Sequence, residues 1–318
     1  MSHPHLWTDL DCAGLNKTRI YLERSLPLPI NLSLYRNGLI PSDPFFHITP
    51  HTIRRLKSLS VVGGPGDLQK IVNHLSQPAP LLEELSIHGD CDRRNPALMS
   101  ALFNGDLSSL RKLCLKYTLT ELPWRNMTNL TSLMLSHTMP GETTVDHLLD
   151  FLESAPNLHQ INLYSAIPTS GARARRSVLL ACLKWMCTAG GSSSLLLDHL
   201  LIPVGARLIT EVESPSPPIT DAPPRFIDNL RNLHNFTMIR LYGEEAYPHM
   251  RFSGPNGEVG MTLRAPGVNA TFLVLGSLTR FDTSKTERLE IVGGDPLYSN
   301  SLYCALLPLK NLRAFALY

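Results

Sequence analysis

The sequence predicts an α/β fold in which short parallel strands stack side by side and helices or turns connect them. Three observations lead to this prediction. A six-residue pattern of one apolar, two free, one apolar, one free and one apolar residue recurs along the chain. Successive copies are separated by a fairly constant interval. Apolar residues with helical spacing occupy several of the intervals.

The pattern is clearest in five copies between residues 56 and 163. These copies are Leu56, Leu59 and Val61; Leu82, Leu85 and Ile87; Leu110, Leu113 and Leu115; Leu130, Leu133 and Leu135; and Leu158, Ile161 and Leu163. They begin 26, 28, 20 and 28 residues apart, within the range of roughly 20–29 residues that is typical of leucine-rich repeats. A weaker copy stands at Leu197, Leu200 and Ile202, and the rhythm returns from Thr286 to Tyr318. We therefore expect a horseshoe-like leucine-rich-repeat solenoid with strands inside and helices outside.

Three helices are expected between the strands. The first follows Asp67 and carries apolar residues at helical spacing up to Leu75. The second follows Thr143 or Thr144, either of which can cap it. The third is expected at about residues 177–186. One unit of this kind cannot bury its own apolar face, so neighbouring units must stack.

The domain organisation follows from where the pattern begins and loosens. Residues 1–50 are expected to form an N-terminal segment that packs on the solenoid, and residues 51–318 the repeat domain, with an irregular insertion at about 204–264. Short strands are expected in this insertion at Thr237–Tyr242, His249–Phe252 and Val259–Arg264, and a helix at Phe226–Leu233. The sequence Gly254-Pro255-Asn256-Gly257 is a strong turn signal, which indicates a hairpin.

Composition argues against several classes of protein. The chain has 318 residues, with 29 basic and 27 acidic residues and a net charge of +2, so a nucleic-acid-binding surface is not expected. No signal peptide follows Met1, and no apolar stretch approaches the roughly 18 residues of a membrane span. We expect a protein of the cytoplasm, the nucleus or both, with no membrane partner. The six cysteines are scattered and are expected to be free thiols.

No motif for catalysis or cofactor binding is present, so no catalytic residue, cofactor or metal is expected. The sequence contains no nucleophile elbow, no HExxH and no Walker lysine at the required spacing. His88, Asp90, Cys91 and Asp92 form the best metal-like cluster, but a second pair at zinc-site spacing is missing. A hydrolase with its site in residues 206–264, using His234 or His249 as a base, is the less favoured alternative.

The free positions within and beside the strand pattern are the candidate binding site. They should face the concave surface of a solenoid, where such proteins commonly bind a macromolecular partner. The candidate residues are Glu84, Ser86, His88, Lys112, Cys114, Lys116, Ser132, Met134, Ser136, Gln160, Asn162 and Tyr164. The alternative is that they form an ordinary solvated face. We expect a protein target, and we expect Tyr164 and Lys112 to be replaceable without loss of folding.

Several segments resemble mushroom-type fungal F-box/leucine-rich-repeat proteins in the region after the F-box. These segments are HLWTDL (5–10), YLERS (21–25), PINLSL (29–34), LDHLLIP (197–203), RFSGPNG (251–257), LTRFD (278–282) and TERL (286–289). The resemblance spans nearly the whole chain, and the order of the segments is more informative than any one of them.

The resemblance implies a substrate receptor of a cullin-type ubiquitin ligase. In such a receptor the F-box binds the ligase adaptor and the repeat domain holds the target. The F-box of roughly 40 residues would precede Trp7, where this chain offers no room for it. The resemblance therefore supports the fold and target binding better than membership of a ligase, and we expect the adaptor as a partner only if an F-box is encoded upstream. The alternatives are a ligase-independent scaffold, a decoy or a truncated gene product.

Overall fold

The computed structural model describes most of the chain in two compact units. The described residues are 3–11, 15–35, 49–89, 97–99, 102–105, 107–120, 127–138, 144–167, 176–190, 193–203, 205–213, 236–242, 249–255, 257–264, 283–292, 306–307 and 309–317. The first unit comprises Met1–Thr143 and Ser154–Leu158, and the second comprises Thr144–Glu153 and His159–Tyr318. Each unit is described by itself.

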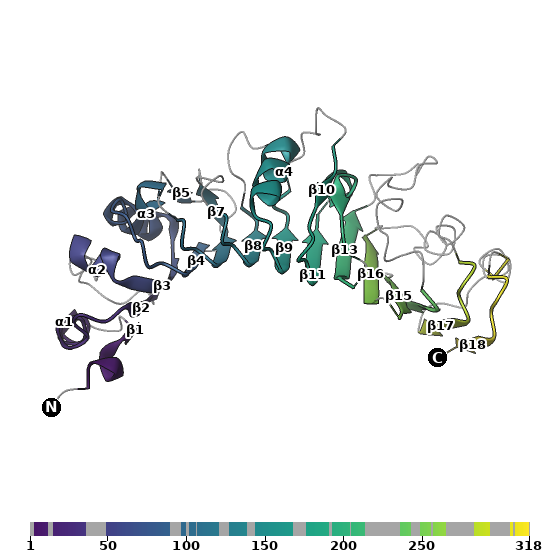
Figure 1. Cartoon of the computed structure of the whole chain (residues 1–318), viewed down its shortest axis with the longest axis horizontal. Coiled ribbons are helices and arrows are strands. Elements are labelled where there is room, and N and C mark those ends of the chain that lie inside the picture. Colours follow the sequence, from purple (N-terminus) through teal and green to yellow (C-terminus); the bar gives the residue numbers. More distant parts are fainter. Residues whose placement is uncertain are drawn as a thin grey trace. The chain divides into compact units, whose positions relative to one another are not determined.

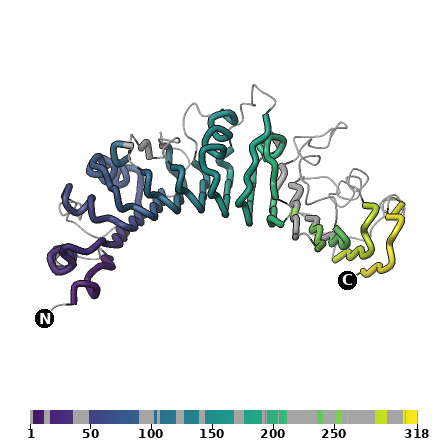
Figure 2. The backbone as a smooth tube through the Cα atoms, viewed as in Figure 1, coloured from purple at the N-terminus to yellow at the C-terminus, as the bar shows by residue number. Residues whose placement is uncertain are grey.

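The first unit is a parallel sheet whose strands are ordered as they occur in the chain. Its elements are η1 (Pro4–Trp7), β1 (Asp9–Asp11), α1 (Leu15–Arg24), β2 (Ile30–Tyr35), α2 (Pro50–Arg54), β3 (Leu56–Gly63), α3 (Pro65–His74), β4 (Glu84–Gly89), β5 (Ala97–Met99), η3 (Leu102–Gly105), β6 (Lys112–Lys116), β7 (Thr118–Thr120) and β8 (Ser132–Ser136). Strands β1, β2, β3, β4, β6 and β8 each pair in parallel with the next (Figures 1 and 2). Strands β5 and β7 pair separately. The sheet therefore already begins within residues 1–50.

Two columns of buried apolar side chains run across this sheet. In one column Leu59 pairs with Leu85, Leu85 with Leu113 and Leu113 with Leu133; in the next, Val61, Ile87, Leu115 and Leu135 pair in the same way. All eight side chains are at most 1% exposed. Because parallel strands lie about 4.8 Å apart, each apolar side chain packs against its counterpart on the neighbouring strand. The recurring sequence pattern thus corresponds to the buried face of the sheet.

A tight turn precedes the strands and adds a buried position that the sequence pattern missed. The backbone N–H of Leu82 donates to the carbonyl oxygen of Ala79 at 3.0 Å, that of Leu110 to Leu107 at 3.0 Å, and that of Leu130 to Met127 at 3.1 Å. Ala79, Leu107 and Met127 are at most 1% exposed. The apolar residue three positions before the first leucine is therefore part of the same core, although its variable size conceals it in the sequence.

Arg55 fixes the N-terminal strands to the rest of the first unit. Its guanidinium donates to the carbonyl oxygen of Leu28 at 2.9 Å and to the hydroxyl of Ser25 at 2.7 Å. Its carbonyl oxygen accepts from the N–H of Ile30 at 2.9 Å. The side chain is only 7% exposed, and burial lowers its pKa. A buried cation that meets several acceptors holds the turn before β2 in one place.

The second unit contains a mostly parallel sheet that includes one hairpin. Its elements are α4 (Val145–Ser154), β9 (Gln160–Tyr164), β10 (Val178–Leu179), β11 (Trp185–Ala189), α5 (Ser193–Leu197), β12 (Leu200–Leu201), β13 (Arg207–Glu213), β14 (Met238–Tyr242), β15 (His249–Gly254), β16 (Gly257–Arg264), β17 (Arg288–Val292) and β18 (Ala314–Leu317). The strand order is β9, β11, β13, β16, β15, β14, β17 and β18. Only β15 in this order runs antiparallel to its neighbours.

Several sequence predictions are confirmed in these elements. Helices α3 and α4 occur where helical spacing predicted them, and the N–H of His147 donates to the hydroxyl of Thr144 at 3.4 Å at the start of α4. Strands β15 and β16 form the expected hairpin, with Gly254 paired to Gly257. The helix expected at Phe226–Leu233 lies outside the described residues.

Two predictions between residues 177 and 202 are wrong. Instead of a helix over 177–186, the chain forms β10 and then β11. The copy at Leu197, Leu200 and Ile202 does not lie in the main sheet, because β12 pairs with β10 alone. The strand in the sheet is β11, which places buried Thr188 beside Leu163 of β9. The hydroxyl of Thr188 donates to that of Thr210 on β13 at 3.0 Å, so two buried polar residues satisfy each other.

Both units thus have an α/β construction with mostly parallel strands and few helices, and the described strands do not close into a barrel. In the described part of the chain, no helix combines the length and the apolar character that crossing a membrane requires.

Candidate functional site

The side chains that alternate with the buried columns form an open face on each sheet. In the first unit we define it by the outward residues of β3, β4, β6 and β8: Ser58, Ser60, Val62, Glu84, Ser86, His88, Lys112, Cys114, Lys116, Ser132, Met134 and Ser136. Most are half-buried, and Lys112 is exposed. Helices α2 and α3 lie to one side of β3 and β4 (Figure 1), and α3 buries Leu68, Ile71 and Val72.

The structure brings nine predicted site residues together on this open face, in three columns. Glu84, Lys112 and Ser132 are neighbours across β4, β6 and β8. Ser86, Cys114 and Met134 form the middle column, and His88, Lys116 and Ser136 form the third. The strand register predicted from the apolar pattern is therefore confirmed for these nine positions.

The first column carries an ion pair. The Nζ atom of Lys112 lies 2.6 Å from Oε1 of Glu84, and the two side chains are 61% and 47% exposed. Pairs so open to water contribute about 0–1 kcal/mol to stability. Folding therefore gains little from this pair, and both charges are accessible at the surface.

A group of soft side chains around Cys114 spans the middle and third columns. The Sγ atom of Cys114 lies 3.4 Å from Nε2 of His88 and 3.4 Å from Sδ of Met134. The hydroxyl oxygen of Ser86 lies 3.1 Å from the same His88 nitrogen. We call His88, Cys114 and Met134 the soft cluster. Three strands contribute one residue each, so the strand register itself assembles the group.

Burial sets the protonation of the soft cluster. Burial lowers the pKa of His88, and the positive charge of Lys116 lowers it further. Burial raises the pKa of the Cys114 thiol, and the Ser86 hydrogen bond and the Lys116 charge oppose this rise. Without a ligand, the cluster is therefore an uncharged imidazole beside a protonated thiol. Such a thiol is a poor nucleophile.

In the second unit the predicted residues Gln160, Asn162 and Tyr164 lie on β9. Tyr164 accepts a hydrogen bond from the thiol of Cys187 on β11 at 3.2 Å, and Cys187 is 5% exposed. Oδ1 of Asn162 is buried and meets no hydrogen-bond donor among the described residues. Trp185 neighbours Gln160 across the two strands. This stretch of the open face is more aromatic than its counterpart in the first unit.

Sequence reasoning missed a charged group on β14 and β17. Glu290 has a side chain that is 2% exposed, and its Oε2 accepts a hydrogen bond from Nε of Arg240. Nη2 of Arg288 lies 2.6 Å from the same carboxylate. The hydrogen bond from Arg240 lowers the pKa of Glu290, although burial opposes this shift. The segment had been assigned to an irregular insertion, so the alternation of Met238, Arg240 and Tyr242 went unused.

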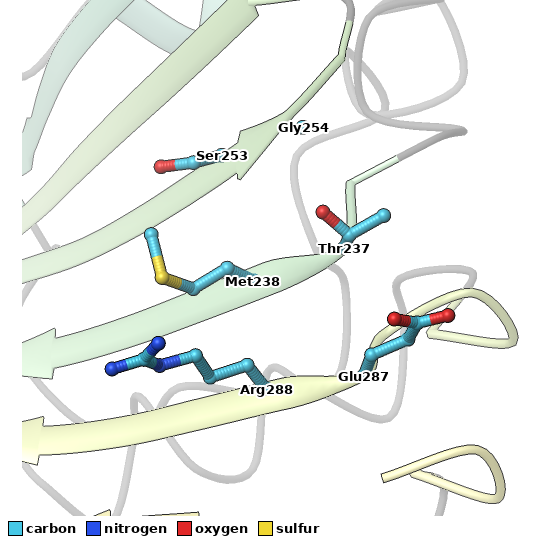
Figure 3. Close-up of a pocket in the computed structure, with 6 residues that line it drawn as sticks. All are labelled: Thr237, Met238, Ser253, Gly254, Glu287 and Arg288. Carbon is cyan, nitrogen blue, oxygen red and sulfur yellow. The ribbon is translucent and has the colours of Figure 1, made fainter. Parts of the chain in front are cut away.

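A pocket of about 440 Å³ adjoins this charged group. It is lined by Thr237, Met238, Ser253, Gly254, Glu287 and Arg288. Figure 3 shows Met238, Ser253 and Arg288 on neighbouring strands, with Thr237 and Glu287 where two of the strands begin. The charges that line it, Glu287 and Arg288, have opposite sign, so the pocket does not select strongly for either charge.

The remaining candidates from the sequence fall on undescribed positions. Asp90, Cys91 and Asp92 lie outside the described residues, as does His234, and the side chain of His249 is not described. Among the residues that are described, no group of three or more His, Cys, Asp or Glu side chains is arranged to hold a metal ion. His88, the first member of the metal-like sequence cluster, contacts Cys114 instead.

Comparison with known proteins adds no assignment. No family model matches the sequence, and no curated protein matches it at a significant level.

Proposed function

We propose that the chain is a leucine-rich-repeat protein-binding domain and that the open face of its parallel strands recognises a protein partner. The carrying observation is the register of β4, β6 and β8, which aligns three outward side chains per strand beside fully buried apolar columns. Extended faces of this kind suit a macromolecular partner better than a small molecule. The open face also offers accessible charges of both signs at Glu84 and Lys112.

The role in a cell is proposed from the sequence resemblance. The domain would be the target-recognition part of an F-box-type subunit of a cullin ubiquitin ligase. It would act by tethering, since holding a target near the ligase raises its effective concentration. No residue of the chain would make or break bonds. A ligase-independent scaffold remains the alternative, and adaptor binding separates the two.

Site-specific cross-linking in cells of the source organism tests whether the open face binds a protein. A photo-reactive residue replaces Ser132 on the open face, and the control position is Lys70, an exposed residue of α3. The proposal predicts one specific cross-linked protein from position 132 and none from position 70. Equal labelling from both positions, or no specific product from position 132, would refute it.

A charge swap separates loss of binding from loss of folding. Lys112→Glu places two carboxylates together, whereas the double variant Glu84→Lys with Lys112→Glu restores an ion pair in the opposite orientation. The double variant should fold like the wild type and still lose the cross-link, because the partner meets reversed charges. Full recovery of the cross-link in the double variant would argue against recognition by these charges.

The ligase role has its own measurement. The full-length gene product, including any upstream segment, is purified with the cullin adaptor. Stoichiometric co-purification supports the receptor role, and its absence favours a scaffold without ligase function. Neither outcome alters the cross-linking result.

A further inference from the structure

The soft cluster places a thiol sulfur in contact with two other metal-binding atoms on the first unit. An imidazole nitrogen, a thiol sulfur and a thioether sulfur come from β4, β6 and β8, and the thiol lies 3.4 Å from each of the other two. We propose that His88, Cys114 and Met134 form a three-coordinate binding site for monovalent copper, Cu(I). This inference does not depend on the proposed protein-binding function.

The spacing of the Cys114 sulfur from each of its two neighbours fits a shared metal ion. Atoms that bind one ion at about 2.0 Å for nitrogen and 2.3 Å for sulfur lie roughly 3.5–4.0 Å apart. The two distances of 3.4 Å need to widen by only a few tenths of an ångström.

The identity of the donors selects the metal. Thiolate and thioether sulfur are soft ligands, and this combination favours Cu(I) over Mg²⁺, Ca²⁺ or Mn²⁺. Structural zinc sites are almost always four-coordinate and use nitrogen, thiolate or carboxylate donors, and Met134 supplies none of these.

Charge also favours a monovalent ion. Lys116 is paired with His88 across β4 and β6, so its ammonium group opposes added positive charge at the site. Binding of Cu(I) displaces the thiol proton to solvent and forms one copper–thiolate bond, so the net charge of the site does not change. A divalent ion would add one positive charge beside Lys116. No oxidant or reductant takes part in this step.

The arrangement fits a metal better than a nucleophile. A thiol and an imidazole at 3.4 Å also occur in cysteine hydrolases, where the thiolate is the reactive form. Here Sδ of Met134 also contacts the Cys114 sulfur, at 3.4 Å. Exchange of the thiol proton, which goes to solvent, for a bound metal ion is the remaining chemistry that uses all three side chains.

The first experiment is a Cu(I) titration of the full chain without oxygen, in competition with a coloured Cu(I) chelator. Met134→Leu removes the thioether at nearly constant volume, and Met238→Leu on β14 is its matched control. Cys114→Ser removes the thiol, with Cys187→Ser as the control. We expect one tight site in the wild type and in both controls, with affinity weakened by at least about tenfold in Met134→Leu and Cys114→Ser. Equal affinity across all five proteins would overturn the proposal.

A second experiment needs no variant and remains informative if a substitution prevents folding. X-ray absorption of the wild-type chain loaded with one Cu(I) should show one nitrogen and two sulfur ligands. A copper environment of sulfur alone would place the metal on other cysteines and refute this site. Failure to retain Cu(I) at all would refute it as well.

Discussion

The open faces of β4, β6 and β8 in the first unit and of β14, β15 and β17 in the second are built on similar strands but handle charge differently. On the first, the ion pair of Glu84 with Lys112 is open to water and the middle column is uncharged. On the second, Glu290 is buried and bound by Arg240 and Arg288. A carboxylate removed from water must keep its partners, whereas an exposed one need not. Charged residues of the first face can therefore be substituted with little loss of stability, whereas those around Glu290 cannot.

The largest effect is expected in the buried column of the first unit. Leu113→Ala removes a side chain that is 1% exposed, so we expect a loss of about 2–5 kcal/mol in the free energy of unfolding, measured with urea. Lys112→Ala on the adjacent position should cost about 1 kcal/mol or less. A comparable loss in both variants would show that the assigned strand register is incorrect.

The next effect comes from close backbone contact in the first unit. A Cβ atom on Gly89 would overlap the carbonyl oxygen of Tyr117, so Gly89→Ala should lower stability by about 2–3 kcal/mol. Gly66→Ala in α3 meets no atom within 4 Å and should be neutral or stabilising by up to about 1 kcal/mol. Thermal unfolding of the two variants measures these effects. A Gly89→Ala variant as stable as the wild type would contradict the close contact between Gly89 and Tyr117.

The buried carboxylate of the second unit should give a smaller effect that depends on pH. Glu290→Gln removes the charge that Arg240 and Arg288 neutralise, so the melting temperature should fall at pH 7. The pKa of Glu290 is below its ordinary 4.5 in the folded chain, so its contribution is complete above pH 4.5 and declines as the pH falls below that value. The wild type and variant should therefore converge in acid. A difference that is constant from pH 7 to pH 3 would contradict this account, and Glu84→Gln serves as the exposed control.

The smallest effect concerns protonation alone. Lys116→Gln removes a positive charge that lowers the pKa of His88, so that pKa should rise in an NMR titration of the imidazole signals. Lys112→Gln, whose ammonium group pairs with Glu84, should leave it nearly unchanged. Equal shifts in both variants would mean that His88 responds to overall charge and not to its neighbour.

The sequence predicted the regular part of the molecule well because one physical rule repeats there. The recurring apolar residues of β3, β4, β6, β8 and β9 all lie in the core, so the apolar pattern alone identified these strands. It failed at β11, because Thr188 is buried with Thr210 as its partner and a pattern of apolar letters cannot show a polar pair. It also missed strand β13 and the additional buried residue before each strand.

The candidate site was predicted as a set of positions but not as a set of contacts. Alternation along the strands was enough to place Ser86, Cys114 and Met134 on the open face. Their meeting depends on pairing residues that are 28 and 20 positions apart, which only the register reveals. The group around Glu290 was missed for the same reason, since Arg240 is 50 positions away in sequence.

The register of the parallel strands has a consequence for how the open face could be mapped. Residues that are side by side on it, such as Glu84, Lys112 and Ser132, are separated by one whole connection along the chain. A short synthetic peptide from this sequence therefore contains at most one strand of the surface. Overlapping-peptide arrays should fail to detect a partner or an antibody that binds here, even when the intact chain binds it tightly. A partner that binds this surface contacts residues from several strands and not one continuous stretch of the sequence.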